Sequence, residues 1–195
     1  MKKLLQKTYD KMLELSEGKG AIMALFAVAF AESSFFPIPP DIMLIPMILA
    51  TPKKAYKIAL FATLASVLGG YFGYLIGAVF FDLVARPVID FYHAMPKFEK
   101  FQEYYQTYGA WIVFGAGLTP FPYKIITIAS GAVHLDLIVF TVASILARGG
   151  RFFIVAWLLK KYGAPMKVFI EKNLGWLTIL FLILLIGSFA VLKWL

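Results

Sequence analysis

Two apolar stretches of this 195-residue chain are interrupted near their middle by clustered prolines and by charge. The first covers residues 21–50 and carries at its centre Glu32, Pro37, Pro39, Pro40 and Asp41. The second covers residues 109–133 and carries Pro120, Pro122 and Lys124. A membrane-crossing helix needs about 20 apolar residues and must satisfy its backbone groups within itself. Broken helices with ionisable side chains at that depth therefore predict a protein-lined or hydrated transport cavity.

The composition indicates an integral membrane protein. Hydrophobic residues make up 61% of the chain and the mean hydropathy is +0.80, which is typical of membrane proteins. We expect a single membrane domain over residues 1–195, with no separate soluble domain. Cysteine is absent, and His93 and His134 have no metal-ligand spacing, so we expect no metal site and no cofactor.

The order of the segments predicts an all-α membrane protein with two inverted repeats. Each repeat is a re-entrant hairpin of two short helices, over residues 21–50 and 109–133, followed by a transmembrane helix, over residues 58–84 and 137–159. Proline lacks the helical donor and disfavours helical geometry in the residue before it, so the proline clusters are predicted to form the hairpin tips. Hairpins that enter from opposite faces would bring their tips together near the midplane.

Three further segments are predicted around these repeats. Residues 1–19 fit an amphipathic helix in the membrane interface, and residues 86–108 fit a polar, aromatic interfacial segment. Residues 174–192 are apolar enough for a final transmembrane helix.

Small residues line one face of the segment 58–84: Ala62, Ser66, Gly69, Gly73 and Gly77. Such a face allows another helix to approach closely. We expect this partner to be a helix of the same chain, while an oligomer stays open.

Basic residues indicate the orientation. If each hairpin returns to its own side, twelve lysines share the side of the N-terminus: Lys2, Lys3, Lys7, Lys11, Lys19, Lys53, Lys54, Lys57, Lys160, Lys161, Lys167 and Lys172. Four basic residues lie on the other side: Arg86, Lys97, Lys100 and Lys193. Because cytoplasmic loops are rich in lysine and arginine, the N-terminus is predicted to be cytoplasmic. The net charge of +8 is thus explained by lipid headgroups and topology, and no nucleic acid is expected.

Five ionisable residues fall inside the apolar segments: Glu32, Asp41, Lys124, Arg148 and Arg151. Each would cost about 2.5 to 3.5 kcal/mol if it were unpaired there. We therefore expect the two acids to pair with bases across the repeat interface, which leaves one positive charge for an anionic phosphate headgroup. The pairs could also be purely structural. Desolvation favours the protonated form of a carboxyl group, so Glu32 or Asp41 could carry a proton.

Two motifs carry a family resemblance. Residues 32–41, Glu-Ser-Ser-Phe-Phe-Pro-Ile-Pro-Pro-Asp, resemble the acidic and proline signature of the DedA family, also called the VTT or SNARE-associated domain family. Residues 117–124, Gly-Leu-Thr-Pro-Phe-Pro-Tyr-Lys, with the Ala-Ser-Gly of residues 129–131, resemble its second re-entrant motif. Residues 148–152, Arg-Gly-Gly-Arg-Phe, are similar to the YqaA-like branch.

The resemblance implies a multi-pass protein of the bacterial or archaeal cytoplasmic membrane that moves lipids between leaflets. The implied substrates are polyprenyl phosphates or phosphatidylethanolamine, and proton-motive force is often involved. The family's acidic positions correspond to Glu32 and Asp41. Better-known members place two arginines in the second hairpin, where this chain has Leu118 or Gly117 and then Lys124, so Arg148 and Arg151 would supply the missing charge.

A lipid flippase or scramblase is thus the leading hypothesis. A proton- or cation-coupled carrier of a small solute would use the same architecture, and a non-transporting membrane-homeostasis factor is a further alternative. A membrane enzyme that acts on lipid phosphates is not expected, because no nucleophile, histidine and acid stand together. Ser33, Ser34 and Thr119 are interpreted as hydrogen-bonding residues of the tips.

Overall fold

The computed structural model describes residues 20–36, 39–81, 83, 86–91, 93, 95–119, 121–163 and 165. The regular secondary structure of these residues is helical throughout: α2 (Ala21–Ser34), α3 (Asp41–Ala50), a 3-10 helix (Pro52–Lys54), α4 (Ala55–Phe80), α5 (Arg86–Phe91), α6 (Met95–Leu118), α7 (Tyr123–Ala132) and α8 (Leu137–Tyr162). The predicted all-α class is confirmed. The segments predicted at 1–19 and 174–192, and the tip residues Pro37 and Pro120, lie outside the described residues.

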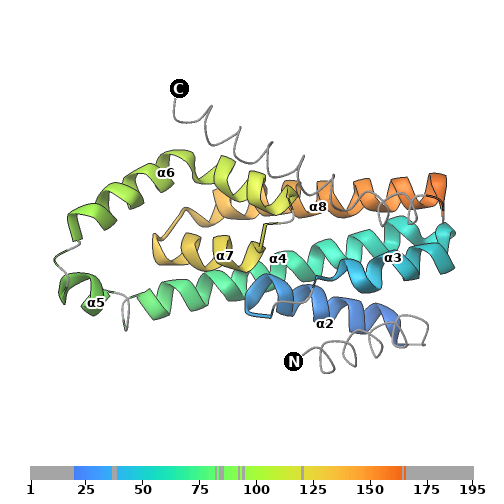
Figure 1. The fold of residues 1–195 in the computed structure, drawn as a ribbon, viewed down its shortest axis with the longest axis horizontal. Helices are drawn as coiled ribbons and strands as arrows, with labels where there is room; N and C mark the ends of the chain where they lie inside the picture. The colour runs from blue at the N-terminus through green and yellow to red at the C-terminus, as the bar shows by residue number, and fades with distance from the viewer. Residues whose placement is uncertain are drawn as a thin grey trace.

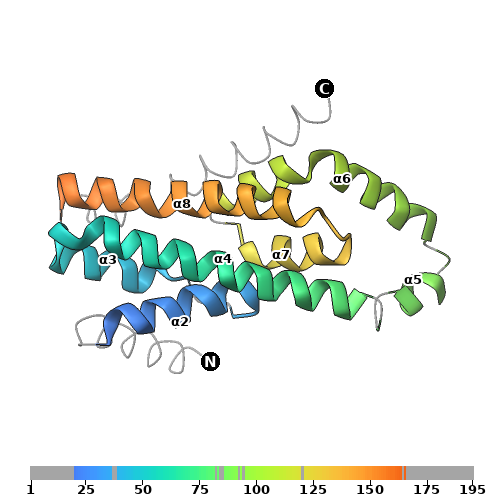
Figure 2. The ribbon, with the colours of Figure 1, turned by 180° about the vertical axis from the view of Figure 1, so that it is seen from behind.

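The two long helices α4 and α8 lie side by side along the molecule, and the shorter helices pack against them (Figures 1 and 2). In Figure 1, α2 runs toward the middle of the molecule and α3 runs back to the end where α4 begins. From the opposite end, α6 runs toward the middle and α7 runs back to where α8 begins. Each short pair thus reverses direction halfway along α4 and α8. Re-entry into a membrane and inverted symmetry stay predictions.

The proline clusters coincide with the two reversals. Helix α2 ends at Ser34, and α3 begins directly after Pro40. Helix α7 likewise begins directly after Pro122, whose backbone is extended. Proline suits the start of a helix because the N–H that it lacks would have no helical partner there. The segments 35–40 and 119–122 are called linker 1 and linker 2 below.

Several helix boundaries differ from the predictions. Helix α4 begins at Ala55 and not at residue 58, because Pro52 starts a 3-10 turn and the exposed lysines that follow tolerate helical geometry. Its predicted end at residue 84 lies outside the described residues. Helix α6 continues through Gly109, where the boundary between the interfacial segment and the second hairpin was predicted. Gly109 faces Leu135 so closely that a side chain there would collide with it. This glycine therefore serves packing, not the end of a helix.

Helix α8 begins at an aspartate cap and covers 137–162. The Asp136 carboxylate accepts hydrogen bonds of 2.9 Å from the backbone N–H groups of Ile138 and Val139. Among the described residues, Pro52–Phe80 and Leu137–Tyr162 are long and apolar enough to cross a membrane. Each 26-residue α-helix is about 39 Å long, which exceeds the roughly 30 Å hydrocarbon core.

The predicted small-residue face makes contacts within the chain. The α-carbon of Gly69 faces the Phe30 carbonyl of α2, and that of Gly77 faces the Ile128 carbonyl of α7. In return, Gly131 of α7 faces the Tyr74 carbonyl of α4. A β-carbon at any of these positions would overlap backbone atoms. The prediction of an intrachain helix contact is confirmed.

Two apolar clusters leave a polar layer between them. One cluster joins α2 and α3 to residues 55–62 of α4 and 152–159 of α8. The other joins α6 and α7 to residues 140–143 of α8, with Tyr71 and Tyr74 of α4 packed against it. Between the clusters, at mid-length of the long helices, lie buried Ser66 and Arg148. The fold therefore concentrates buried polarity where the two linkers meet.

Candidate functional site

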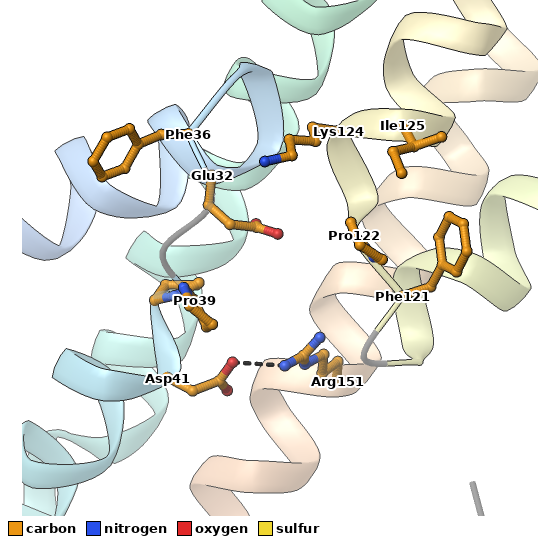
Figure 3. A pocket seen from close by; sticks show the side chains of 10 residues that line it. Glu32, Phe36, Pro39, Asp41, Phe121, Pro122, Lys124, Ile125 and Arg151 are labelled. Atoms are coloured by element: carbon orange, nitrogen blue, oxygen red, sulfur yellow. Dashed lines mark hydrogen bonds and ion pairs between the residues drawn. The ribbon is translucent and has the colours of Figure 1, made fainter. Parts of the chain in front are cut away.

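A pocket of about 260 Å³ lies where the two linkers meet. Its lining comes from both halves of the chain: Glu32, Phe36, Pro39, Pro40, Asp41, Phe121, Pro122, Lys124, Ile125 and Arg151. Figure 3 shows the acidic side chains on one wall, from α2 and α3, facing basic side chains from α7 and α8. The structure thus brings together four of the five predicted charged site residues, and three of the predicted tip prolines.

Arg151 connects three segments at one end of this pocket. Its Nη2 donates a 2.6 Å hydrogen bond to Oδ2 of Asp41, the first residue of α3. Its Nη1 donates a 3.1 Å hydrogen bond to the carbonyl oxygen of Thr119 at the start of linker 2. The Arg151 and Asp41 side chains keep 19% and 20% of their surface exposed. A single guanidinium therefore holds α8, α3 and linker 2 together at the pocket surface.

Glu32 belongs to a closed ring of hydrogen bonds. Arg148 donates from Nη2 to Oε2 of Glu32 at 2.8 Å and from Nε to Oγ of Ser66 at 2.6 Å. Ser66 and Ser33 share a 2.7 Å hydrogen bond, and Ser33 donates to the same Glu32 oxygen at 3.2 Å. Because each serine has one proton to donate, Ser66 must be the donor to Ser33. Both serine hydroxyl groups of the ring thus donate and accept a hydrogen bond, which fixes the position of the Glu32 carboxylate.

Arg148 is fully enclosed behind Glu32. Only 1% of its side chain is exposed, and its guanidinium lies 5.0 Å from the centre of the Tyr123 ring and 4.8 Å from that of Phe152. One nitrogen, Nη1, is buried and has no hydrogen-bond partner among the described residues. Arg148 does not line the pocket, in contrast to its predicted contact with substrate. We therefore interpret Arg148 as a residue that holds the Glu32 side chain in place in the pocket wall.

Lys124 differs from the other four predicted charged site residues in its pairing. Acid–base pairing is confirmed for Glu32 with Arg148 and for Asp41 with Arg151. Half-buried Lys124 lines the pocket and forms no ion pair within the described part of the chain. The charge that the sequence predicts to be spare is therefore that of Lys124.

The remaining pocket wall is apolar. Phe36 and Ile125 line it while 39% and 51% of their surface is exposed, and half-buried Phe121 lies between the prolines of linker 2. Figure 3 shows Phe121 and Ile125 on the same wall as Pro122 and Lys124. A ligand with an anionic end and an apolar body would match both parts of the pocket.

Several hydroxyl residues of the site were not predicted as such. Ser66 was assigned only to a packing face, and Ser33 to the first tip, whereas both belong to the ring around Arg148. Thr127 of α7 donates to the Ser33 carbonyl at 3.0 Å and so joins the two short helix pairs. Tyr123 donates to Ser144 beside Arg148. For Ser66, the sequence offers one indication of this role: Ser66 and Arg148 both lie midway along long apolar segments.

Metal binding finds no support in the site geometry. Within the described ranges, no three histidine, cysteine, aspartate or glutamate side chains come close enough together to hold a metal ion. The expectation of no metal and no cofactor stays a prediction.

The helical fold and its buried polar layer define a class of membrane proteins in which charge lies between broken helices. Residues 38–161 match the model of the VTT domain. The chain therefore belongs to the VTT domain family, the DedA family of membrane proteins.

Two relatives extend over nearly the whole chain. A protein of Haemophilus influenzae, described as uncharacterized, is 36% identical over 195 residues, which cover 98% of this chain and 99% of the relative. A protein of Histophilus somni, also described as uncharacterized, is 36% identical over 195 residues, which cover 98% of this chain and 100% of the relative. No solved structure matches.

Proposed function

We propose that this protein is a flippase or scramblase that moves a phosphate-bearing lipid, such as a polyprenyl phosphate or a phospholipid, between membrane leaflets. The pocket between the linkers would hold the headgroup. The observation that carries the proposal is that Lys124, which forms no ion pair with any residue that the structure describes, lies beside the exposed apolar side chains of Phe36 and Ile125. A lysine ammonium binds phosphate as a point charge, and an apolar wall suits acyl or prenyl chains.

The size of the pocket supports a headgroup site. Pockets that enclose drug-sized ligands have about 300–1,000 Å³, so 260 Å³ suits a headgroup and not a whole lipid. The lipid tail would remain outside, along the exposed apolar faces of the helices. Such partial enclosure is what movement of a headgroup between leaflets requires.

The proposed membrane arrangement follows the course of the helices. Helices α4 and α8 would cross the bacterial or archaeal cytoplasmic membrane, and the short pairs would re-enter from opposite faces as inverted repeats. The lysine distribution places the N-terminus in the cytoplasm in this arrangement. The pocket would then lie near the bilayer midplane, where alternating access to both leaflets is possible.

Replacing Lys124 by glutamine is expected to slow exchange of phosphate lipids between leaflets about tenfold. A hydrogen bond to a charged group contributes about 1.5–3 kcal/mol, and about 1.4 kcal/mol corresponds to a factor of ten. The measurement is leaflet exchange in vesicles containing purified protein, with fluorescent lipids that carry a phosphomonoester, a phosphodiester or a hydroxyl headgroup. Lys53→Gln is the matched control, because Lys53 is exposed on the 3-10 helix and does not line the pocket.

The same assay with Glu32→Ala and Arg151→Ala tests the rest of the site. Equal rates for these variants, for Lys124→Gln and for the wild type would contradict the proposed site. Uptake of a solute without lipid exchange would favour the small-solute carrier, and release of phosphate from the lipid would favour an enzyme. Repeating the assay across a pH gradient with Glu32→Gln and Asp41→Asn tests proton coupling, which unchanged proton dependence in both variants would exclude.

A further inference from the structure

The two ion pairs of the site differ in their surroundings. The Glu32–Arg148 pair has 13% and 1% of its side chains exposed, and Arg148 does not reach the pocket. Both members of the Asp41–Arg151 pair line the pocket and are about one-fifth exposed. A ligand in the pocket can therefore reach Arg151 directly but meets only the Glu32 side of the other pair.

The Glu32–Arg148 pair is held by additional bonds. Ser33 and Ser66 close the hydrogen-bonded ring with it, and two aromatic rings lie against the Arg148 guanidinium. Separating this pair would leave a buried guanidinium without a counter-ion, which is strongly unfavourable. The pair is therefore a fixed part of the pocket wall.

The Asp41–Arg151 pair can separate at a lower cost. Asp41 is the first residue of α3, where the helix dipole stabilises a carboxylate even without arginine. Arg151 has a planar guanidinium that binds a phosphate in the same way as a carboxylate. A phosphate in the pocket can thus take the place that the Asp41 carboxylate occupies.

We propose that Asp41 is an internal competitor of the substrate: Arg151 exchanges the Asp41 carboxylate for the phosphate of the ligand. This inference rests on the proposed function of the same pocket. In the structure, Arg151 binds Asp41 of α3 and the Thr119 carbonyl of linker 2, and so connects the two halves of the chain. Transfer of Arg151 to the phosphate removes this polar link between the start of α3 and α8, which couples headgroup binding to opening of the pocket.

Binding of dodecyl phosphate tests the exchange. The probe is radiolabelled dodecyl phosphate, with uncharged dodecanol as the control compound, and the full-length protein is held in phosphatidylcholine nanodiscs. Asp41→Asn removes the competing charge, so binding should tighten roughly tenfold, as expected when about one-tenth of wild-type molecules have a free Arg151. Asp41→Glu keeps the charge and should bind like the wild type.

Two further variants separate charge competition from altered packing. Glu32→Gln, which changes the fixed pair, should not tighten binding of the probe. Asp41→Ser also removes the charge and leaves a small polar side chain at the first residue of α3, so it should tighten binding as Asp41→Asn does, and it serves if the asparagine variant does not fold. The rate of leaflet exchange should fall in Asp41→Asn although dodecyl phosphate binds more tightly, because no carboxylate at residue 41 then displaces the phosphate from Arg151.

The outcomes distinguish this inference from the proposed function. If the wild type binds dodecyl phosphate in an Arg151-dependent manner, but neither Asp41→Asn nor Asp41→Ser binds it more tightly, the exchange is wrong and the headgroup site stands. If neither the wild type nor these variants bind the probe more tightly than dodecanol, the headgroup site itself is wrong, and the exchange with it.

Discussion

Replacing Arg148 by alanine is expected to destabilise the folded protein by about 3 kcal/mol, the lower end of the range for removing one partner of a buried ion pair. The lower end applies because the Glu32 carboxylate is 13% exposed at the pocket and keeps some contact with solvent. The variant also deprives Ser66 of its donor and leaves a hole between Tyr123 and Phe152. The buried polar layer would then lack the guanidinium that hydrogen-bonds both Glu32 and Ser66.

Thermal and denaturant unfolding of the purified protein measures this loss. Arg151→Ala is the matched control, because that residue sits one turn further along α8 in a pair that is about one-fifth exposed. Its loss of stability should be clearly smaller. In the double variant Glu32→Gln/Arg148→Met, removal of both charges should restore much of the stability. Equal stability of Arg148→Ala and the wild type would show that the ring does not hold this layer together.

Replacing Gly131 by valine is expected to separate α7 from α4 and to cost about 3 kcal/mol, the upper end of the usual range for overpacking. A β-carbon at Gly131 would overlap the Tyr74 carbonyl, which is backbone and cannot move out of the way as a side chain can. Gly77 meets Ile128 in the same crossing. Because α7 carries Lys124 and follows linker 2, the pocket should be lost together with the helix contact.

Gly115 provides the control for this prediction. It lies inside α6, and a β-carbon there would meet no atom within 4 Å. Gly115→Ala should therefore be neutral or stabilise the protein by up to about 1 kcal/mol, the difference in helix propensity. Gly131→Val should lower both the unfolding midpoint and the binding of dodecyl phosphate, whereas Gly115→Ala should lower neither. A glycine-to-valine variant as stable as the wild type would mean that α4 and α7 do not pack this closely.

Local signals predicted much of the fold. Proline clusters mark both chain reversals, because proline interrupts a helix wherever it occurs in an apolar run. The small-residue face of α4 predicted a close helix contact, since only backbone atoms then limit the approach. The boundary predicted at Gly109 is wrong. In a sequence, a glycine that ends a helix cannot be distinguished from one that allows a neighbouring side chain to pack closely. Contact with Leu135 decides between them, and that contact is between distant parts of the chain.

The sequence predicted which charged residues form the candidate site better than it predicted the role of each one. The cost of unpaired charge in an apolar segment predicted that both acids would be paired, and the structure pairs both. Which base pairs with which acid depends on the register of α8 against α2 and α3, which sequence spacing does not contain. One turn of α8 separates buried Arg148 from pocket-lining Arg151. The hydroxyl of Ser66 was overlooked because serine is equally suited to a packing face, whereas Ser33 was expected to form hydrogen bonds, but at the tip and not in a ring with Arg148.

Photochemical labelling tests the central claim, that the pocket between the linkers holds the phosphate end of a lipid. The probe is an alkyl phosphate with a diazirine next to the phosphate, applied to the protein in phosphatidylcholine nanodiscs, with the adducts located by mass spectrometry. We predict adducts at Phe36, Phe121 and Ile125, and we predict that Lys124→Gln reduces them. Labelling concentrated on outward-facing apolar residues such as Met23 and Ile138, with no effect of Lys124→Gln, would contradict the account.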